Sequence, residues 1–88
     1  MPKARAKKTL SYRRVGGVLY VADASVPSLH EFNETGAVIW EMSAIGRLRP
    51  EIIDGLTRQF DVTRAAAAED VDEFLELLYA KGLLETVD

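Results

Sequence analysis

The stretch SLHEFNETGAVIW, residues 28–40, decides how this chain of 88 residues folds. Residues 28–32 predict a short strand, and Asn33 suits a helix N-cap because its side-chain oxygen can accept from the free amides of the first turn. Glu34, in that first turn, suits the positive end of the helix dipole. The chain is therefore expected to change from strands to helices at a single residue.

Two more strands are expected before this stretch. Residues 10–15 and 18–21 are rich in strand-forming side chains, and Gly16-Gly17 between them favours a tight hairpin. Pro27 cannot donate a hydrogen bond to a sheet, so the strand after it, Ser28 to Phe32, is expected at an edge. An open edge in a folded protein is either covered or used.

Three helices are expected after the strands. The first spans Glu34 to about Ala44, the second Pro50 to Phe60, and the third Arg64 to about Lys81. Together with the strands they predict an α+β fold, a three-stranded antiparallel sheet followed by three helices in a winged helix-turn-helix-like layout.

The third helix carries two neighbouring stripes of residues. Its core face follows helical spacing and comprises Ala67, Val71, Phe74, Leu75 and Leu78. The second stripe comprises Ala66, Asp70, Leu77 and Lys81, with Phe74 at the border between the two. Thr63 is the expected N-cap of this helix and Gly82 its C-terminal glycine, after which residues 83–85 are expected to fold back over the core.

Composition argues against several classes of function. The chain has no cysteine, which excludes disulfides and thiolate zinc sites, and His30 is its only histidine. No nucleophile–base pair can be assembled, so we expect no catalytic residue, no metal site, no cofactor and no enzyme activity. No apolar run approaches the length that spans a bilayer, and the expected location is cytoplasmic.

Charge is distributed unevenly along the chain. Residues 1–14 hold six of the eleven Lys and Arg residues and no acid, whereas residues 15–88 hold all fourteen acids. We expect residues 1–9 to form a disordered basic arm and residues 10–88 to form a single domain. An acidic body disfavours nucleic acid as its partner, because neutralising phosphates supplies most of that affinity.

Four short phrases resemble the PqqD-like family. They are LHEFNETGA at 29–37, PEII at 50–53, DVDEFLELL at 70–78 and KGLL at 81–84. The resemblance covers about residues 15–85 and implies a RiPP precursor recognition element. Members of this kind are non-catalytic peptide chaperones that hold the leader of a ribosomally made precursor peptide and present it to a modifying enzyme.

The resemblance also implies a binding mode, in which the leader adds a strand to the third strand and packs on the third helix. Carried onto this chain, the leader-binding residues would be Ser28, Leu29, His30, Glu31, Phe32, Ala66, Asp70, Val71, Phe74 and Leu77. Acids on the third helix would favour a leader that contains lysine or arginine.

The implied partners are a precursor peptide and its modifying enzyme. That enzyme would be a radical SAM maturase, as in pyrroloquinoline quinone biosynthesis, or a leader peptidase, as in lasso peptide biosynthesis. Residues 1–14 do not match the proline-rich, glycine-containing entry segment of PqqD proper, so both kinds of pathway stay open.

Two other functions share the predicted layout. A winged-helix DNA-binding protein would place the third helix in the major groove, but this helix carries Arg64 and Lys81 against five acids. A small structural domain would instead form a homodimer by pairing the free strand edge with its own copy.

Overall fold

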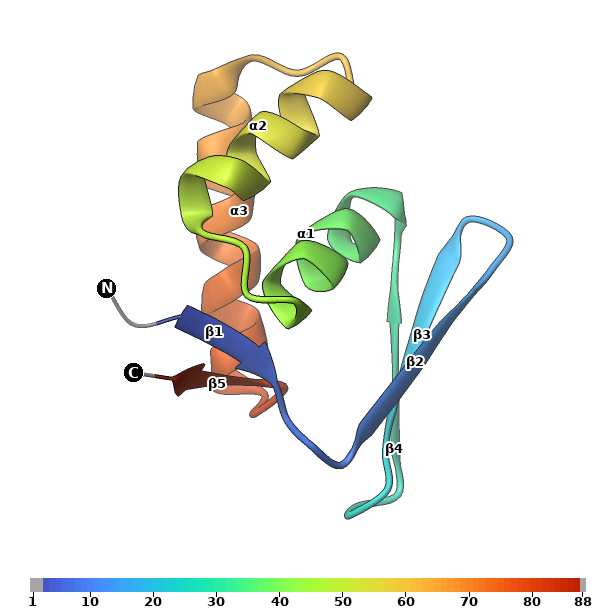
Figure 1. Ribbon diagram of the computed structural model, residues 1–88. Coiled ribbons are helices and arrows are strands. Elements are labelled where there is room, and N and C mark those ends of the chain that lie inside the picture. Colours follow the sequence, from blue (N-terminus) through green and yellow to red (C-terminus); the bar gives the residue numbers. More distant parts are fainter. Residues whose placement is uncertain (1–2, 88) are drawn as a thin grey trace.

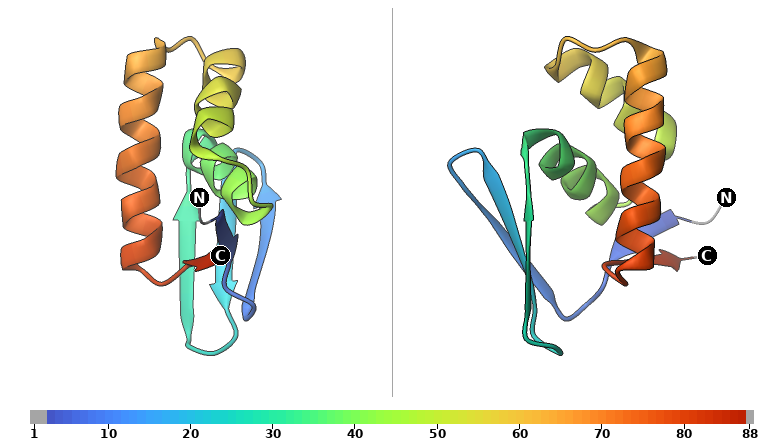
Figure 2. Two further views of the ribbon diagram at one scale, coloured as in Figure 1. Left: turned by 60° about the vertical axis from the view of Figure 1, so that its left-hand side comes forward. Right: turned by 180° about the vertical axis from the view of Figure 1, so that it is seen from behind.

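Figure 1 shows the computed structural model of the chain, which describes residues 3–87. A three-stranded antiparallel sheet lies on one side and three helices on the other, with α1 between the sheet and α3 (Figures 1 and 2). This confirms the expected α+β, winged helix-turn-helix-like fold. The elements of this part are β2 (Leu10–Val15), β3 (Val18–Asp23), β4 (Ser28–Phe32), α1 (Glu34–Ala44), α2 (Arg49–Gln59) and α3 (Arg64–Ala80).

The sheet has β3 at its centre, with β2 and β4 on its two sides. A glycine hairpin joins β2 to β3, and Gly16 adopts the positive φ of 63° that such tight turns require. Leu19 and Val21 of β3 lie opposite Phe32 and His30 of β4. Since side chains alternate between the two faces of a strand, these four residues point toward the helices. Leu19 and Val21 are completely buried there.

The helices begin where their capping residues predict. The Asn33 side chain accepts from the Gly36 amide at 2.9 Å, and the Thr63 hydroxyl accepts from the Ala66 amide at 3.1 Å. The expected caps of α1 and α3 are therefore confirmed. The second helix begins at Arg49 and ends at Gln59, one residue earlier at each end than expected.

The core has two parts that meet at α1. Between α1 and the sheet, Trp40 is completely buried, with its ring 6.4 Å from that of Phe32 and 5.6 Å from that of Tyr12. Between the three helices a second cluster includes Ile39 of α1 and Val71 of α3, both almost fully buried. The three helices are thus fixed to one another and to the sheet.

The start of the chain differs from the expected disordered arm over residues 1–9. Lys3–Ala6 forms strand β1, which pairs antiparallel with β5 (Leu84–Val87) in a second, two-stranded sheet below α3 (Figure 1). The Lys7 amide extends this pairing to the Leu83 carbonyl at 3.1 Å. The expectation of disorder is therefore wrong for Lys3–Ala6, because a partner strand at the other end of the chain satisfies its backbone. Met1 and Pro2 lie outside the described residues.

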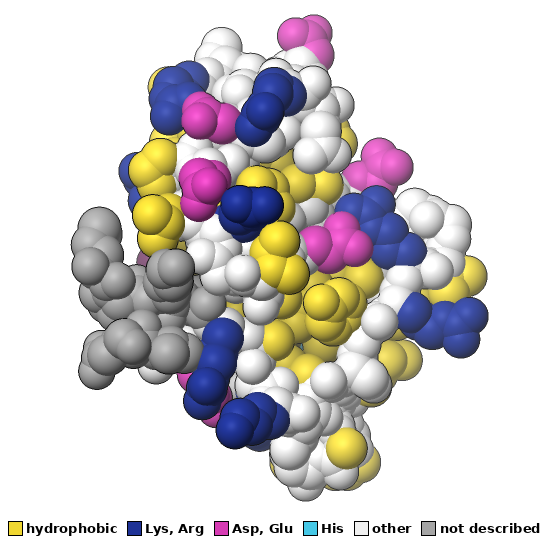
Figure 3. Space-filling model, viewed as in Figure 1, with side chains coloured by type: hydrophobic (Ala, Val, Ile, Leu, Met, Phe, Trp, Pro, Cys, Tyr) yellow, Lys and Arg dark blue, Asp and Glu magenta, His cyan; other side chains and the backbone are white. Residues whose placement is uncertain are grey.

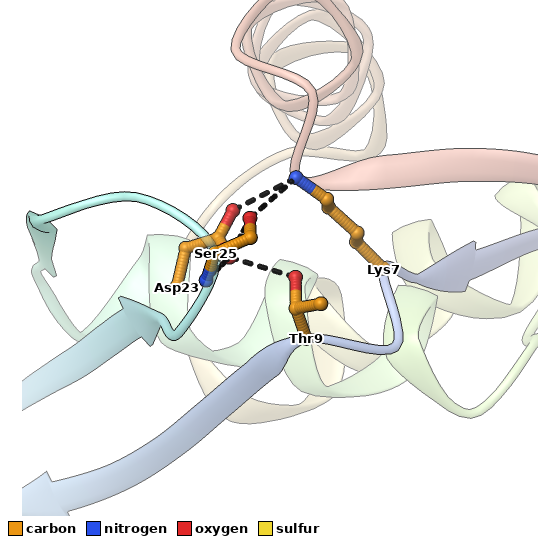
Figure 4. A network of polar contacts seen from close by, with 4 residues as sticks. All are labelled: Lys7, Thr9, Asp23 and Ser25. Atoms are coloured by element: carbon orange, nitrogen blue, oxygen red, sulfur yellow. Dashed lines mark hydrogen bonds and ion pairs between the residues drawn. The ribbon is translucent and has the colours of Figure 1, made fainter.

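A polar cluster fixes the chain between the two sheets, as Figure 4 shows. The buried carboxylate of Asp23 accepts from the Ser25 hydroxyl at 2.6 Å, the Thr9 hydroxyl at 2.7 Å and the Lys7 ammonium at 3.0 Å. The hydrogen bonds from Ser25 and Thr9, followed by that from Lys7, hold the pKa of Asp23 far below its ordinary value. Asp23 thus ties the segment between β1 and β2 to the turn between β3 and β4.

Candidate functional site

A groove runs between β4 and α3, which lie beside each other in opposite directions (Figure 2). It consists of two connected cavities, which share Asn33, Phe74 and Leu77. The α1 cavity measures about 410 Å³ and is lined by Asn33, Thr35, Gly36, Ile39, Asp70, Glu73, Phe74 and Leu77. The β4 cavity measures about 530 Å³ and is lined by Leu29, His30, Glu31, Phe32, Asn33, Phe74, Leu77 and Lys81.

Aromatic and aliphatic side chains form the floor of this groove. The Phe74 ring meets the Phe32 ring edge to face at 5.0 Å, and the His30 ring stacks on Phe32 at 6.4 Å. Gly36 permits this packing, since a Cβ at that position would lie 2.9 Å from the Phe74 ring. Leu77 stays 42% exposed at the rim. The floor therefore offers apolar surface to an occupant.

The outer edge of β4 supplies the second feature of the groove, its backbone groups. The amide of Ala24, directly after β3, donates at 3.0 Å to the carbonyl that precedes β2. Because backbone groups alternate between the two sides of an antiparallel strand, those of Val21 then point to β4 and bond its partner His30. The backbone amides and carbonyls of Leu29 and Glu31 therefore point outward, along the free edge beside the groove.

Charged side chains stand at both ends of the groove. Asp70 and Glu73 line the α1 cavity, and Lys81 lines the β4 cavity together with Glu31 of β4. Among residues 3–87, none of these four has an ion-pair partner. On another face of α3, Asp72 accepts from Arg49 at 2.6 and 2.9 Å, and this hydrogen bonding lowers the pKa of Asp72. The groove charges thus remain available to an occupant.

The structure brings together most of the residues that the sequence predicted for the site. Leu29, His30, Glu31 and Phe32 line the β4 cavity, Asp70 lines the α1 cavity, and Phe74 and Leu77 line both.

The other three predicted residues lie outside the groove lining. Val71 is completely buried in the core between the helices, so it cannot form a groove wall. Its spacing with Ala67 and Leu78 already indicated that position. Ala66 is exposed, one turn of α3 before Asp70, and Ser28 lies half-buried at the start of β4.

Several lining residues were absent from the predicted set. Lys81 belongs to the same helical stripe as Leu77 and could have been included on that ground. Glu73 lies three residues after Asp70 and four before Leu77, so helical spacing also indicated it. Thr35 and Gly36 line the α1 cavity because α1 packs against α3, and local sequence does not determine this packing.

Two other kinds of functional feature are absent from the described residues, namely a metal-binding cluster and a membrane-spanning helix. Within residues 3–87, no group of three or more His, Asp or Glu side chains could hold a metal ion. No helix in this part of the chain combines the length and the apolar character needed to cross a membrane.

Comparisons with known proteins identify the family. No protein with curated function matches the chain. Two solved structures share its fold: "TbiB1 in Complex with the TbiA(beta) Leader Peptide" has a TM-score of 0.83 and 21% identity, covering 92% of this chain and 94% of that one. "Lasso peptide synthetase B1 complexed with the leader peptide" has a TM-score of 0.84 and 19% identity, covering 94% and 98%. The family model "Coenzyme PQQ synthesis protein D (PqqD)" matches residues 18–84, so the chain belongs to the PqqD family.

Proposed function

We propose that this chain is a non-catalytic peptide chaperone that binds the leader of a ribosomally made precursor peptide. The observation that carries this proposal is the groove, in which the free backbone edge at Leu29 and Glu31 faces the same opening as Phe74 and Leu77. An extended peptide in the groove would bond β4 by strand addition and place alternate side chains against α3. Family membership and the leader peptides named in both similar structures support this class of ligand.

The proposal gives the chain a holding role and assigns the chemistry to a partner. The leader would stay bound along β4 while a separate enzyme modifies the rest of the precursor. That enzyme would be a radical SAM maturase, as in pyrroloquinoline quinone biosynthesis, or a lasso-peptide leader peptidase. Asp70 and Glu73, which have no ion-pair partner among residues 3–87, favour a peptide over DNA as the occupant, because they would repel phosphates.

Calorimetric titration tests the proposal directly. The purified chain is titrated with synthetic leaders of the precursor peptides encoded beside its gene, and separately with duplex DNA. We expect saturable binding of one leader and no binding of DNA. Tight DNA binding without a response to any of these peptides would contradict the proposal. A stable homodimer in sedimentation experiments that binds none of these leaders would contradict it as well.

Two further measurements locate the leader and test delivery. In NMR titrations, the amides of Leu29 and Glu31 and the groove face of α3 should shift, whereas the amide of Arg14 on β2 should not. Modification of the precursor by its enzyme should be faster when the chain is present. An equal rate with and without the chain would contradict a role in delivery.

A further inference from the structure

The two ends of the groove carry opposite charge, and this arrangement bears on which peptides fit it. Asp70 and Glu73 lie at the end beside Asn33, where β4 finishes, and Lys81 lies at the end beside Leu29, where β4 begins. Phe74 and Leu77 occupy the space between them. Glu31 also lines the β4 cavity, but its side chain alternates with those of His30 and Phe32 and therefore points to the face of the sheet away from the helices. Along α3, an occupant would thus meet negative, apolar and positive surface in sequence.

The spacing along α3 translates into a spacing along an extended peptide. A helix rises about 1.5 Å per residue, so Lys81 lies about 12 Å along the axis from Glu73 and about 16 Å from Asp70. A strand advances about 3.4 Å per residue, and four residues therefore cover about 14 Å. Side chains two and four residues apart point to the same face of a strand. Three side chains at alternate positions would consequently face the two acids, the apolar centre and Lys81.

The sheet also favours one direction for the added strand. Both pairings within it are antiparallel, and antiparallel pairing is the more stable kind per residue. A peptide antiparallel to β4 enters beside Asn33 and leaves beside Leu29. Its N-terminal part then passes Asp70 and Glu73 before its C-terminal part reaches Lys81.

We infer that the groove selects peptides by the order of their charges. The occupant carries, from N- to C-terminus, a basic residue, an apolar residue two positions later and an acidic residue two positions after that. This inference rests on the proposed function, since it specifies the peptide that the same groove would hold. Complementary charges at both ends fix the register of the peptide as well as its direction.

A displayed library of random short peptides tests the inference on the full chain. The chain is panned against the library, and the enriched sequences are aligned. We expect enrichment of Lys or Arg four residues before Asp or Glu, with an apolar residue midway. One enriched peptide is then synthesised together with a version in which only the two charged residues are exchanged. The exchanged peptide should bind about five- to tenfold more weakly, the size expected for two exposed ion pairs that become repulsive.

A variant with reversed groove charges provides the matched test. It combines Asp70→Lys, Glu73→Lys and Lys81→Glu, all at exposed positions, and should prefer the exchanged peptide. The control is Glu76→Lys, which changes an exposed acid of α3 outside the lining of both cavities and should keep the original preference. Circular dichroism melts check that every variant is folded.

The outcomes separate this inference from the proposed function. Enriched peptides with no charge order, or with the opposite order, would overturn the inference while leaving a peptide-binding function in place. A preference that the reversed variant does not change would overturn it as well. If no peptide is enriched and no leader binds, both the inference and the proposed function are wrong.

Discussion

The two edges of the three-stranded sheet belong to similar strands, yet their surroundings differ. On the β2 side, Arg14 forms an ion pair with Glu41 of α1, and the Tyr12 ring packs on Trp40, so side chains join the strand to its neighbouring helix. Figure 3 shows this side, with apolar side chains gathered at the centre and charged ones around them. On the β4 side, the neighbouring helix is α3, and the groove separates it from the strand.

The proposed site therefore depends on more than a free strand edge. Backbone groups at an edge bond any extended chain, so they supply affinity with little selectivity. Only β4 adds a second wall, where Phe74 and Leu77 offer apolar contact and Asp70 and Lys81 offer charge. We therefore expect changes along the β4 edge and α3 to alter leader binding, and matched changes along β2 to leave it unaffected.

The largest effect is expected from Leu77→Asp. This change replaces apolar surface at the groove rim with a charge that the bound peptide would desolvate, and should weaken leader binding about tenfold or more. The matched control is Tyr79→Asp on the same helix, since Tyr79 is 40% exposed but lies outside the groove lining. Titration calorimetry measures both, together with Glu73→Gln, which should have a smaller effect. Equal losses in all three variants would contradict the role of α3 as the second wall.

Proline substitution compares the two edges directly. Leu29→Pro removes an outward amide of β4 and should weaken leader binding about three- to tenfold, the range of one lost hydrogen bond. Arg14→Pro removes an outward amide of β2 and should leave the affinity unchanged. Fluorescence anisotropy with a labelled leader measures both. An equal response would mean that the peptide does not distinguish the edges.

Gly36→Ala tests how closely α1 must approach α3. The added Cβ would lie 2.9 Å from the outer end of the Phe74 ring, so we expect the ring to move into the groove and binding to weaken about threefold. Stability should change by only about 1 kcal/mol, because alanine favours the helix and partly offsets the contact. The control Gly17→Ala lies in the hairpin beside β2, where the nearest atom is 3.8 Å away. Denaturant unfolding measures the free energy of unfolding, and titration measures the affinity for the leader. A loss of unfolding free energy larger than the loss of binding free energy would contradict this account.

The smallest effect on binding is expected from Asp23→Asn, because Asp23 lies at the end of the central strand β3 rather than along either edge of the sheet. Its carboxylate has a lowered pKa in the folded chain, so the stability it provides is complete above the ordinary value of about 3.9 and is lost as the pH falls below it. Asp23→Asn should lower the melting temperature at neutral pH, and the difference from the unchanged chain should shrink in acid. Melts across this pH range measure it; a difference that grows in acid would contradict the assigned network.

The sequence by itself determined the features that depend on near neighbours. Asn33 and Thr63 cap helices that begin directly after them, and a glycine hairpin joins β2 to β3. Pro27 indicated that the next strand lies at the sheet edge. The periodicity of α3 distinguished its core face from the second stripe that contains Asp70, Leu77 and Lys81. Each of these signals acts within a few residues, where sterics and capping hydrogen bonds decide the conformation. The prediction of a site along one strand and one helix came instead from the resemblance to the PqqD-like family.

Only the tertiary structure decided which residues of these elements meet. Helical spacing gives the angles between side chains of one helix but not the packing of α1 against α3, so only the structure places Thr35 and Gly36 of α1 in the groove. Lys3–Ala6 contains no strand signal and is ordered by pairing with Leu84–Val87 at the far end of the chain. Such contacts depend on how distant segments pack, and the groove exists only because α1 sets α3 beside the free edge of β4.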